Sequence, residues 1–284
     1  MSRIKELINE LYSNEGYNEA FVKNASLCND CETIPKVENA GEILKINNEN
    51  CIIMHNGVMI YENSYHGIWM SDIIKKLRGH HEPQEEKLFY EVLKYIESGS
   101  TMVECGSSWG YYSLWFHKEI LNSKNILIEP NPYKLEMGKL NFLLNGFDGE
   151  FINGYIGDSF VKNSTFVDWD RKEFPSQKIT IDSIFENYSI KKINVLHADI
   201  QHNEDSLLKG SLTSFKNELI DFVFLGTHSN NTIFKNFFKN VGYKIICDFE
   251  VGQSFGDDGL ILACSPTIYK KINLNNFIIT KKQQ

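Results

Sequence analysis

Apolar residues follow a helical period at the start of the main part of the chain and strand-like runs after it. Leu88, Phe89, Val92, Leu93 and Ile96 recur at helical spacing within 84–97, which predicts a helix there. Short apolar runs, separated by helical segments, follow it. Strands are expected at 101–105, 125–129, 150–156, 193–199, 220–225, 243–248 and 259–265, and helices at 111–121, 133–145, 184–188, 204–209 and 231–240.

Strands that alternate with helices form βαβ units. The pattern therefore predicts an α/β fold with a mostly parallel, Rossmann-like sheet that helices cover on both faces. The last two predicted strands have no helix between them, which predicts an antiparallel hairpin at one edge of the sheet.

The first eighty residues form a small α+β extension in this interpretation. An amphipathic helix opens the chain, and β-like runs at 42–46, 51–54 and 58–61, with Asn56-Gly57 between the last two, predict an antiparallel meander. A helix is expected around 68–77. We divide the chain into an N-terminal accessory region at 1–80, a main domain at 81–273 and a polar tail at 274–284. The aromatic residues Tyr65 and Trp69 fit either a lid or a contact in a homo-oligomer.

Composition narrows the class of partner. The 284 residues carry 29 Lys and Arg against 37 Asp and Glu, a net charge of −8, which disfavours a nucleic-acid partner. No apolar run approaches the roughly 18 residues of a membrane span, so no membrane partner is expected. The six cysteines are scattered and are interpreted as reduced thiols, which together with the absence of an export signal predicts a cytoplasmic protein.

The turn after the first strand of the main domain is the first candidate for a ligand site, because ligands of such sheets bind beyond the carboxyl ends of the strands. Gly106 and Gly110 let the backbone approach a ligand, and Ser108 and Ser113 belong to the same turn and helix start. The acid Glu104 precedes them. A carboxylate beside phosphates is unfavourable, so the turn favours a cationic ligand, such as the amino-acid part of S-adenosyl-L-methionine, over a pyrophosphate. The dinucleotide pattern G-x-G-x-x-G is not matched.

The ends of the next two strands add further candidates. Glu129 ends the second strand and is placed to accept hydrogen bonds from ribose hydroxyls, which both nucleotide classes offer. The third strand contains Asn153 and Gly154, where an adenine ring commonly lies against the backbone. We assign all three residues to the cofactor.

These segments resemble class I S-adenosylmethionine-dependent methyltransferases, and in particular the FkbM type. The resemblance rests on 103–113, on Ile-Glu-Pro-Asn-Pro at 128–132, on Ile-Thr-Ile-Asp-Ser at 179–183 and on Val-Leu-His-Ala-Asp-Ile-Gln at 195–201, and it covers roughly 83–265. It implies a class I methyltransferase sheet, with cofactor acids and glycines at Glu104, Gly106, Gly110 and Glu129. The chain departs from the family pattern after Asp199, since Gln-His-Asn-Glu stands where Glu-Gly-Ala-Glu is expected.

Chemistry is expected at the ends of the fourth and fifth strands. Asp199 follows the fourth strand, with His197 and Gln201 at the same two-residue spacing, and His228 follows the fifth. Methyl transfer to a hydroxyl needs an oxygen relieved of its proton. Asp199 or His228 can act as the base, or Mg²⁺ or Mn²⁺ held by Asp199, His228 and His197 can lower the hydroxyl pKa.

Two nearby segments have a structural interpretation beside a role in the site. His202, Glu204 and Asp205 fit a solvated helix start, where acids favour the helix dipole, as well as they fit a functional role. Residues 257–259 favour a turn into the last strand over a place in the lining of the site.

The leading hypothesis is an O-methyltransferase that acts on a hydroxyl of a sugar, a glycan or another secondary-metabolite-like small molecule. The substrate class, and with it a role in carbohydrate modification, is implied by the family resemblance. Two alternatives remain open. An NAD-dependent oxidoreductase is disfavoured by Glu104 and the glycine spacing, and a non-catalytic nucleotide- or carbohydrate-binding module is kept open by residues 201–203.

Overall fold

The computed structural model describes residues 2–168, 171–256 and 258–283. Its main sheet consists of β4 (Thr101–Cys105), β5 (Lys124–Ile128), β6 (Glu150–Ile152), β10 (Ile193–Ala198), β11 (Ile220–Thr227), β12 (Lys244–Phe249) and β13 (Gly259–Cys264). Within the described residues the strand order is β12-β13-β11-β10-β4-β5-β6. Strands β11, β10, β4, β5 and β6 run parallel to one another, whereas β13 is antiparallel to both β11 and β12. The predicted α/β fold and its antiparallel edge pair are confirmed.

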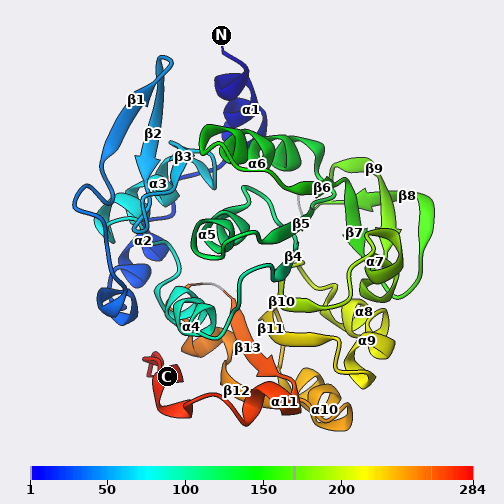
Figure 1. Ribbon diagram of the computed structural model, residues 1–284. Helices are drawn as coiled ribbons and strands as arrows, with labels where there is room; N and C mark the ends of the chain where they lie inside the picture. Colours follow the sequence, from blue (N-terminus) through cyan, green and yellow to red (C-terminus); the bar gives the residue numbers. More distant parts are fainter. Residues whose placement is uncertain (1, 169–170, 257, 284) are drawn as a thin grey trace.

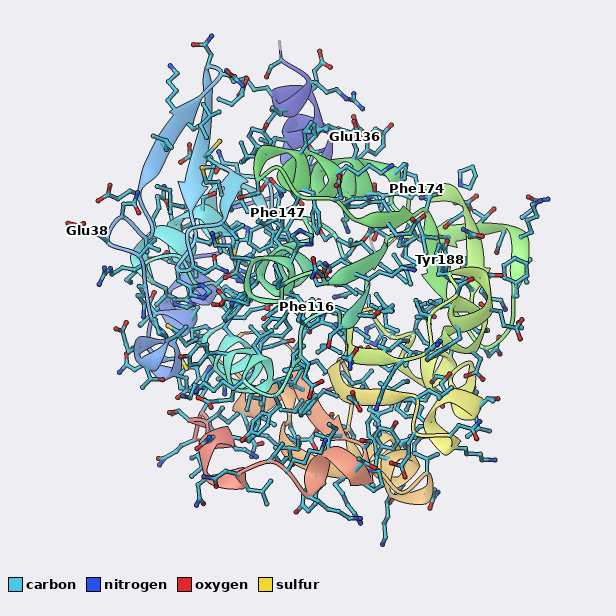
Figure 2. All side chains as sticks on the ribbon, viewed as in Figure 1. Glu38, Phe116, Glu136, Phe147, Phe174 and Tyr188 are labelled. Atoms are coloured by element: carbon cyan, nitrogen blue, oxygen red, sulfur yellow. The ribbon has the colours of Figure 1, made fainter. Side chains whose placement is uncertain are left out.

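Helices cover both faces of this sheet (Figure 1). One side carries α4 (Pro83–Leu93), α5 (Tyr111–Glu119) and α6 (Pro132–Leu144), and the other carries α7 (Ile181–Asn187), α8 (Glu204–Lys209), α9 (Leu212–Lys216) and α10 (Thr232–Asn240). The short helix α11 (Pro266–Tyr269) follows β13. Each face has its own apolar core, with Phe89 and Trp115 buried in one and Phe215 and Phe238 in the other. Figure 2 shows the buried Phe116 of α5 among these side chains, whereas Glu38 lies at the periphery.

The N-terminal region packs against the α6 side of the main domain. It contains α1 (Arg3–Tyr12), α2 (Glu19–Ala25), η1 (Asp30–Thr33), β1 (Ile43–Ile46), β2 (Glu49–Ile53), β3 (Met59–Tyr61) and α3 (Gly67–Lys76). The three strands form the predicted antiparallel meander. The amide of Asn145 accepts from the Met59 N–H and donates to its carbonyl, and the amide of Asn141 accepts from the Tyr61 N–H, so β3 is hydrogen-bonded to α6.

The predicted strand 150–156 is wrong, because two strands of different sheets share this segment. The chain leaves β6 at Asn153, whose side-chain amide donates to the carbonyls of Glu129 and Pro130, and then enters β7 (Gly154–Ile156). A second sheet has the order β7-β9-β8, with β8 (Val161–Val167) and β9 (Glu173–Ile179). The pattern did not predict β8, because most of its side chains on both faces are exposed and leave no apolar alternation.

The segment predicted as a polar tail lies against the body of the molecule. It contains η3 (Leu274–Phe277), in which Phe277 is buried, and the N–H and hydroxyl of Thr280 donate to the carboxylate of Asp30. Among the described helices, none is long and apolar enough to cross a membrane.

Candidate active site

A cavity of about 450 Å³ lies at the carboxyl ends of the central strands. Gly106 after β4, Glu129 after β5 and Asp199 after β10 line it, so it lies where the strand order reverses around β4. Its size fits a nucleotide-sized ligand. The far side of the cavity is formed by the N-terminal region.

The glycine turn lies directly on the backbone of the neighbouring strand end. Gly106 has a φ of +74°, and a Cβ at this position would lie 1.8 Å from the carbonyl oxygen of Asp199. Only glycine combines this conformation with this close approach. Ser108, with a φ of +43°, also lines the cavity and presents its backbone there.

Three predicted cofactor residues of this turn lie beneath it rather than on the cavity wall. The carboxylate of Glu104 accepts a hydrogen bond from the N–H of Ser113 at 3.1 Å, and neither residue is among the described residues that line the cavity. Burial raises the pKa of Glu104. Gly110 begins α5, and a Cβ there would lie 3.1 Å from Leu127 and 3.3 Å from Phe142, so its role is packing.

Glu129 is held in place by two backbone donors. Its carboxylate accepts hydrogen bonds from the N–H groups of Ser108, at 3.0 Å, and Asn131, at 2.9 Å. Burial raises its pKa. A carboxylate has about four lone-pair sites, so capacity remains for ligand hydroxyls. Asn153 and Gly154 support this strand end through bonds to the carbonyl of Glu129 and do not line the cavity within the described residues.

Asp199 and His228 come together because β10 and β11 are neighbours. Nε2 of His228 lies 3.5 Å from Oδ1 of Asp199 and 3.2 Å from Oδ1 of Asp258, while its Nδ1 lies 2.6 Å from Oε1 of Glu204. Asp199, His228 and Asp258 offer ligand atoms within 4.8 Å of one another, a set that suits a divalent cation. Sequence reasoning left the role of Glu204 open and favoured a turn for Asp258; Asp257, also in the predicted turn, lies outside the described residues.

The environment gives the two residues different proton affinities. Burial raises the pKa of Asp199, and the nearby carboxylate of Asp258 raises it further, to about 7. Burial lowers the pKa of His228, but its hydrogen bonds to Asp258 and Glu204 outweigh this and raise the pKa to about 10. At neutral pH Asp199 is therefore able to accept a proton, whereas His228 already carries one.

His197 does not join this group in the structure. Its Nε2 lies 2.7 Å from Oε1 of Glu85, and its ring lies against Tyr112 with centroids 4.3 Å apart. The predicted metal role of His197 therefore has no geometric support. Glu82 and Glu85, at the start of α4, do line the cavity, and they were not among the predicted site residues.

Several residues of the N-terminal region line the cavity, and we call five of them the N-terminal wall: Tyr12, Glu15, Phe21, Tyr65 and Trp69. The ring of Tyr65 stacks on Trp109 with centroids 4.7 Å apart and planes 2° from parallel. The sequence left Tyr65 and Trp69 open between a lid and an oligomer contact, and in the structure both line the cavity.

A second cluster is buried away from the cavity. His55, His80 and Glu86 offer ligand atoms within 4.8 Å of one another. The rings of His55 and His80 are stacked, with centroids 4.2 Å apart and planes 18° apart, so their in-plane lone pairs do not converge on one point. Nδ1 of His55 pairs with the hydroxyl of Tyr111 instead. The contacts within this cluster are hydrogen bonds, between His80 and Glu86 and between Tyr111 and His55.

The sheet is mostly parallel, with one antiparallel strand inserted next to its edge strand, and the cavity lies beside a glycine turn at the strand ends. This is the architecture of class I S-adenosylmethionine-dependent methyltransferases. A family model described as the methyltransferase FkbM domain matches residues 91–245. The chain belongs to the FkbM methyltransferase family.

Comparison with solved structures gives distant likenesses. The chain is similar to a methyltransferase FkbM from Methylobacillus flagellatus KT, at 18% identity and a TM-score of 0.42, over 59% of this chain and 44% of that one. It is also similar to M. capricolum TrmK in complex with S-adenosyl-homocysteine, at 12% identity and a TM-score of 0.41, over 63% and 67% of the two chains. The match thus spans less than half of the first of these proteins. The curated proteins gave no match.

Proposed function

We propose that this chain is an O-methyltransferase that transfers the methyl group of S-adenosylmethionine to a hydroxyl of a sugar or another small molecule. The observation that carries the proposal is the carboxylate of Asp199, which lines the cavity, has its pKa raised to about 7, and belongs to a residue whose backbone packs against Gly106 of the glycine turn. A general base is most effective when its pKa lies near the working pH. The free thiols of the six cysteines support a cytoplasmic location.

The reaction needs one proton acceptor and no redox partner. The acceptor oxygen attacks the methyl carbon, the carbon–sulfur bond breaks, and its electron pair remains on sulfur as S-adenosylhomocysteine forms. The hydroxyl proton passes to Asp199. His228 stays protonated between Asp199, Asp258 and Glu204, where it orients these carboxylates rather than acting as the base.

A divalent cation is a second route to the same chemistry. Asp199, His228 and Asp258 would hold Mg²⁺ or Mn²⁺, which lowers the pKa of a bound hydroxyl. Binding of the cation requires His228 to lose its proton, so affinity for the metal should increase as the pH rises.

Two measurements test the proposal. Isothermal titration with S-adenosylhomocysteine should show binding, and its absence at millimolar concentration would reject the proposal. Transfer from S-[methyl-¹³C]adenosylmethionine to a panel of methyl glycosides should give an O-methyl carbon signal in NMR spectra, at a rate that rises with pH through about 7 without metal. Asp199→Asn should abolish transfer and keep cofactor affinity. Cofactor binding without transfer to any acceptor would favour the non-catalytic alternative, and binding of NADH instead would favour the oxidoreductase.

A further inference from the structure

The cavity has a strong excess of negative charge. Eight carboxylates and two lysines are among the described residues that line it. Both lysines are already paired, since Nζ of Lys134 lies 3.4 Å from Asp168 and Nζ of Lys172 lies 4.0 Å from Glu10. S-Adenosylmethionine carries one net positive charge, which offsets only part of this excess. An anionic acceptor would meet repulsion in this cavity.

Part of this excess lies on the N-terminal wall, which borders the glycine turn through the stacking of Tyr65 on Trp109. Oε1 of Glu15 receives two hydrogen bonds, from Nδ1 of His66 at 2.7 Å and from Nε1 of Trp69 at 3.3 Å. Both donors use the same oxygen, and within the described part of the chain no hydrogen bond is made to Oε2, so this oxygen keeps acceptor capacity. The Glu15 side chain is only 21% exposed, so an ion pair made there is less screened than one at the surface.

Aromatic rings cluster beside this carboxylate, since Trp69, which donates to it, packs against two further rings. The centroid of the Trp69 ring lies 5.0 Å from that of Phe21 and 5.2 Å from that of His66. Aromatic faces beside a carboxylate are a favourable environment for an alkylammonium group. They also provide a flat apolar surface for the carbon–hydrogen face of a saturated ring.

The same wall is continuous with the loop that carries Asp258. A Cβ at Gly256 would lie 3.7 Å from Cζ of Phe21, and both residues line the cavity. The N-terminal wall and the Asp199–Asp258 carboxylates therefore line one continuous cavity.

We propose that the N-terminal wall is the acceptor-binding subsite and that it selects a hydroxylated ring with a protonated amine, such as an amino sugar. The amine pairs with Glu15, the ring stacks on Trp69 and Phe21, and a hydroxyl is directed toward Asp199. This proposal rests on the proposed methyltransferase function and adds the charge class of its substrate.

The test measures binding of three probes to the protein saturated with S-adenosylhomocysteine. The probes are methyl glucosaminide, methyl glucoside and glucose 6-phosphate. The binding of each is measured by ligand-observed NMR titration. Wild type should bind the amine about tenfold more tightly than the neutral glycoside, a difference of about 1.4 kcal/mol, and should not bind the phosphate. Glu15→Gln should reduce the amine's affinity to that of the neutral probe. Glu19→Gln, an exposed change on the adjacent α2, is the matched control and should have no effect.

Each failure has a distinct meaning. Equal affinity for amine and neutral probes, no effect of Glu15→Gln, or no binding of any probe overturns the proposed subsite. If S-adenosylhomocysteine itself fails to bind wild type, the proposed function fails as well. An unchanged affinity of Glu15→Gln for S-adenosylhomocysteine shows that the variant is folded.

Discussion

Gly106 and Asp199 are packed so closely that a Cβ on the glycine would lie 1.8 Å from the aspartate carbonyl oxygen. The N–H of Asp199 also donates to the carbonyl of Cys105 at 3.1 Å. These contacts join the turn assigned to the cofactor to the residue assigned as the base. The position of the carboxylate relative to the cofactor loop is thus set by backbone packing.

Gly106→Ala should disrupt this junction. The substitution adds a steric clash to the strain of a left-handed backbone, which by itself costs about 1–2 kcal/mol. We expect lower stability in urea unfolding and an S-adenosylhomocysteine affinity reduced by more than tenfold. Gly99→Ala is the matched control, because Gly99 has a φ of +80° with no atom within 4 Å of the added carbon. Equal effects of the two changes would contradict a role for the close approach.

Glu129→Gln should weaken cofactor binding without unfolding the protein. The amide keeps one acceptor for the N–H groups of Ser108 and Asn131 but loses charge and acceptor capacity toward ligand hydroxyls. Hydrogen bonds to charged groups contribute about 1.5–3 kcal/mol, so affinity for S-adenosylhomocysteine should fall about 10- to 100-fold in calorimetry. Glu136→Gln on α6 is the control. A Glu129→Gln protein with wild-type affinity would exclude the ribose role.

Glu86→Gln should destabilise the protein most at neutral pH. Burial raises the pKa of Glu86, but His80 and His81 outweigh this and lower it well below 4.5. Because the pKa of Glu86 is lower in the folded than in the unfolded protein, its ionised carboxylate stabilises the fold at any pH above the unfolded-state pKa. This stabilisation is lost progressively as the pH falls below about 4.5 toward the folded-state pKa. We expect a loss of about 3–5 kcal/mol near pH 7, because one partner of a buried pair is removed. In urea unfolding, the difference in free energy of unfolding between wild type and Glu86→Gln should be smaller at pH 4 than at pH 7. The control Glu97→Gln, at an exposed position, should have the free energy of unfolding of wild type at both pH values.

The fold was largely predictable because buried parallel strands and their helices impose simple apolar periods. The pattern failed where hydrogen bonds override it, as at Asn153, whose side chain ends one strand and begins another in a second sheet. It also failed for β8, whose exposed side chains give no period.

The site was predictable only where residues follow a strand in sequence. Asp199 and His228 were proposed in this way, and their proximity follows from neighbouring strands. Glu204 and Asp258 were not among the predicted site residues, because their contacts with His228 depend on how loops return to the strand ends. Glu15 lies more than a hundred residues away in sequence from Asp199, so local patterns gave no indication of it.

Asp258→Asn decides between the base and the metal-assisted route. Oδ1 of Asp258 lies 3.2 Å from Nε2 of His228, within the group of three residues able to hold a cation. If the site binds metal, wild type should bind Mn²⁺ in electron paramagnetic resonance titrations, and more tightly at pH 8 than at pH 6. Asp258→Asn should weaken Mn²⁺ binding at least about tenfold, because a charged ligand is lost. Asp205→Asn, an exposed aspartate of α8 paired with Lys209, is the control and should bind as wild type does. Failure of wild type to bind Mn²⁺ at millimolar concentration, with transfer unaffected by EDTA, would leave Asp199 as the base and assign Asp258 to holding His228 in its protonated form.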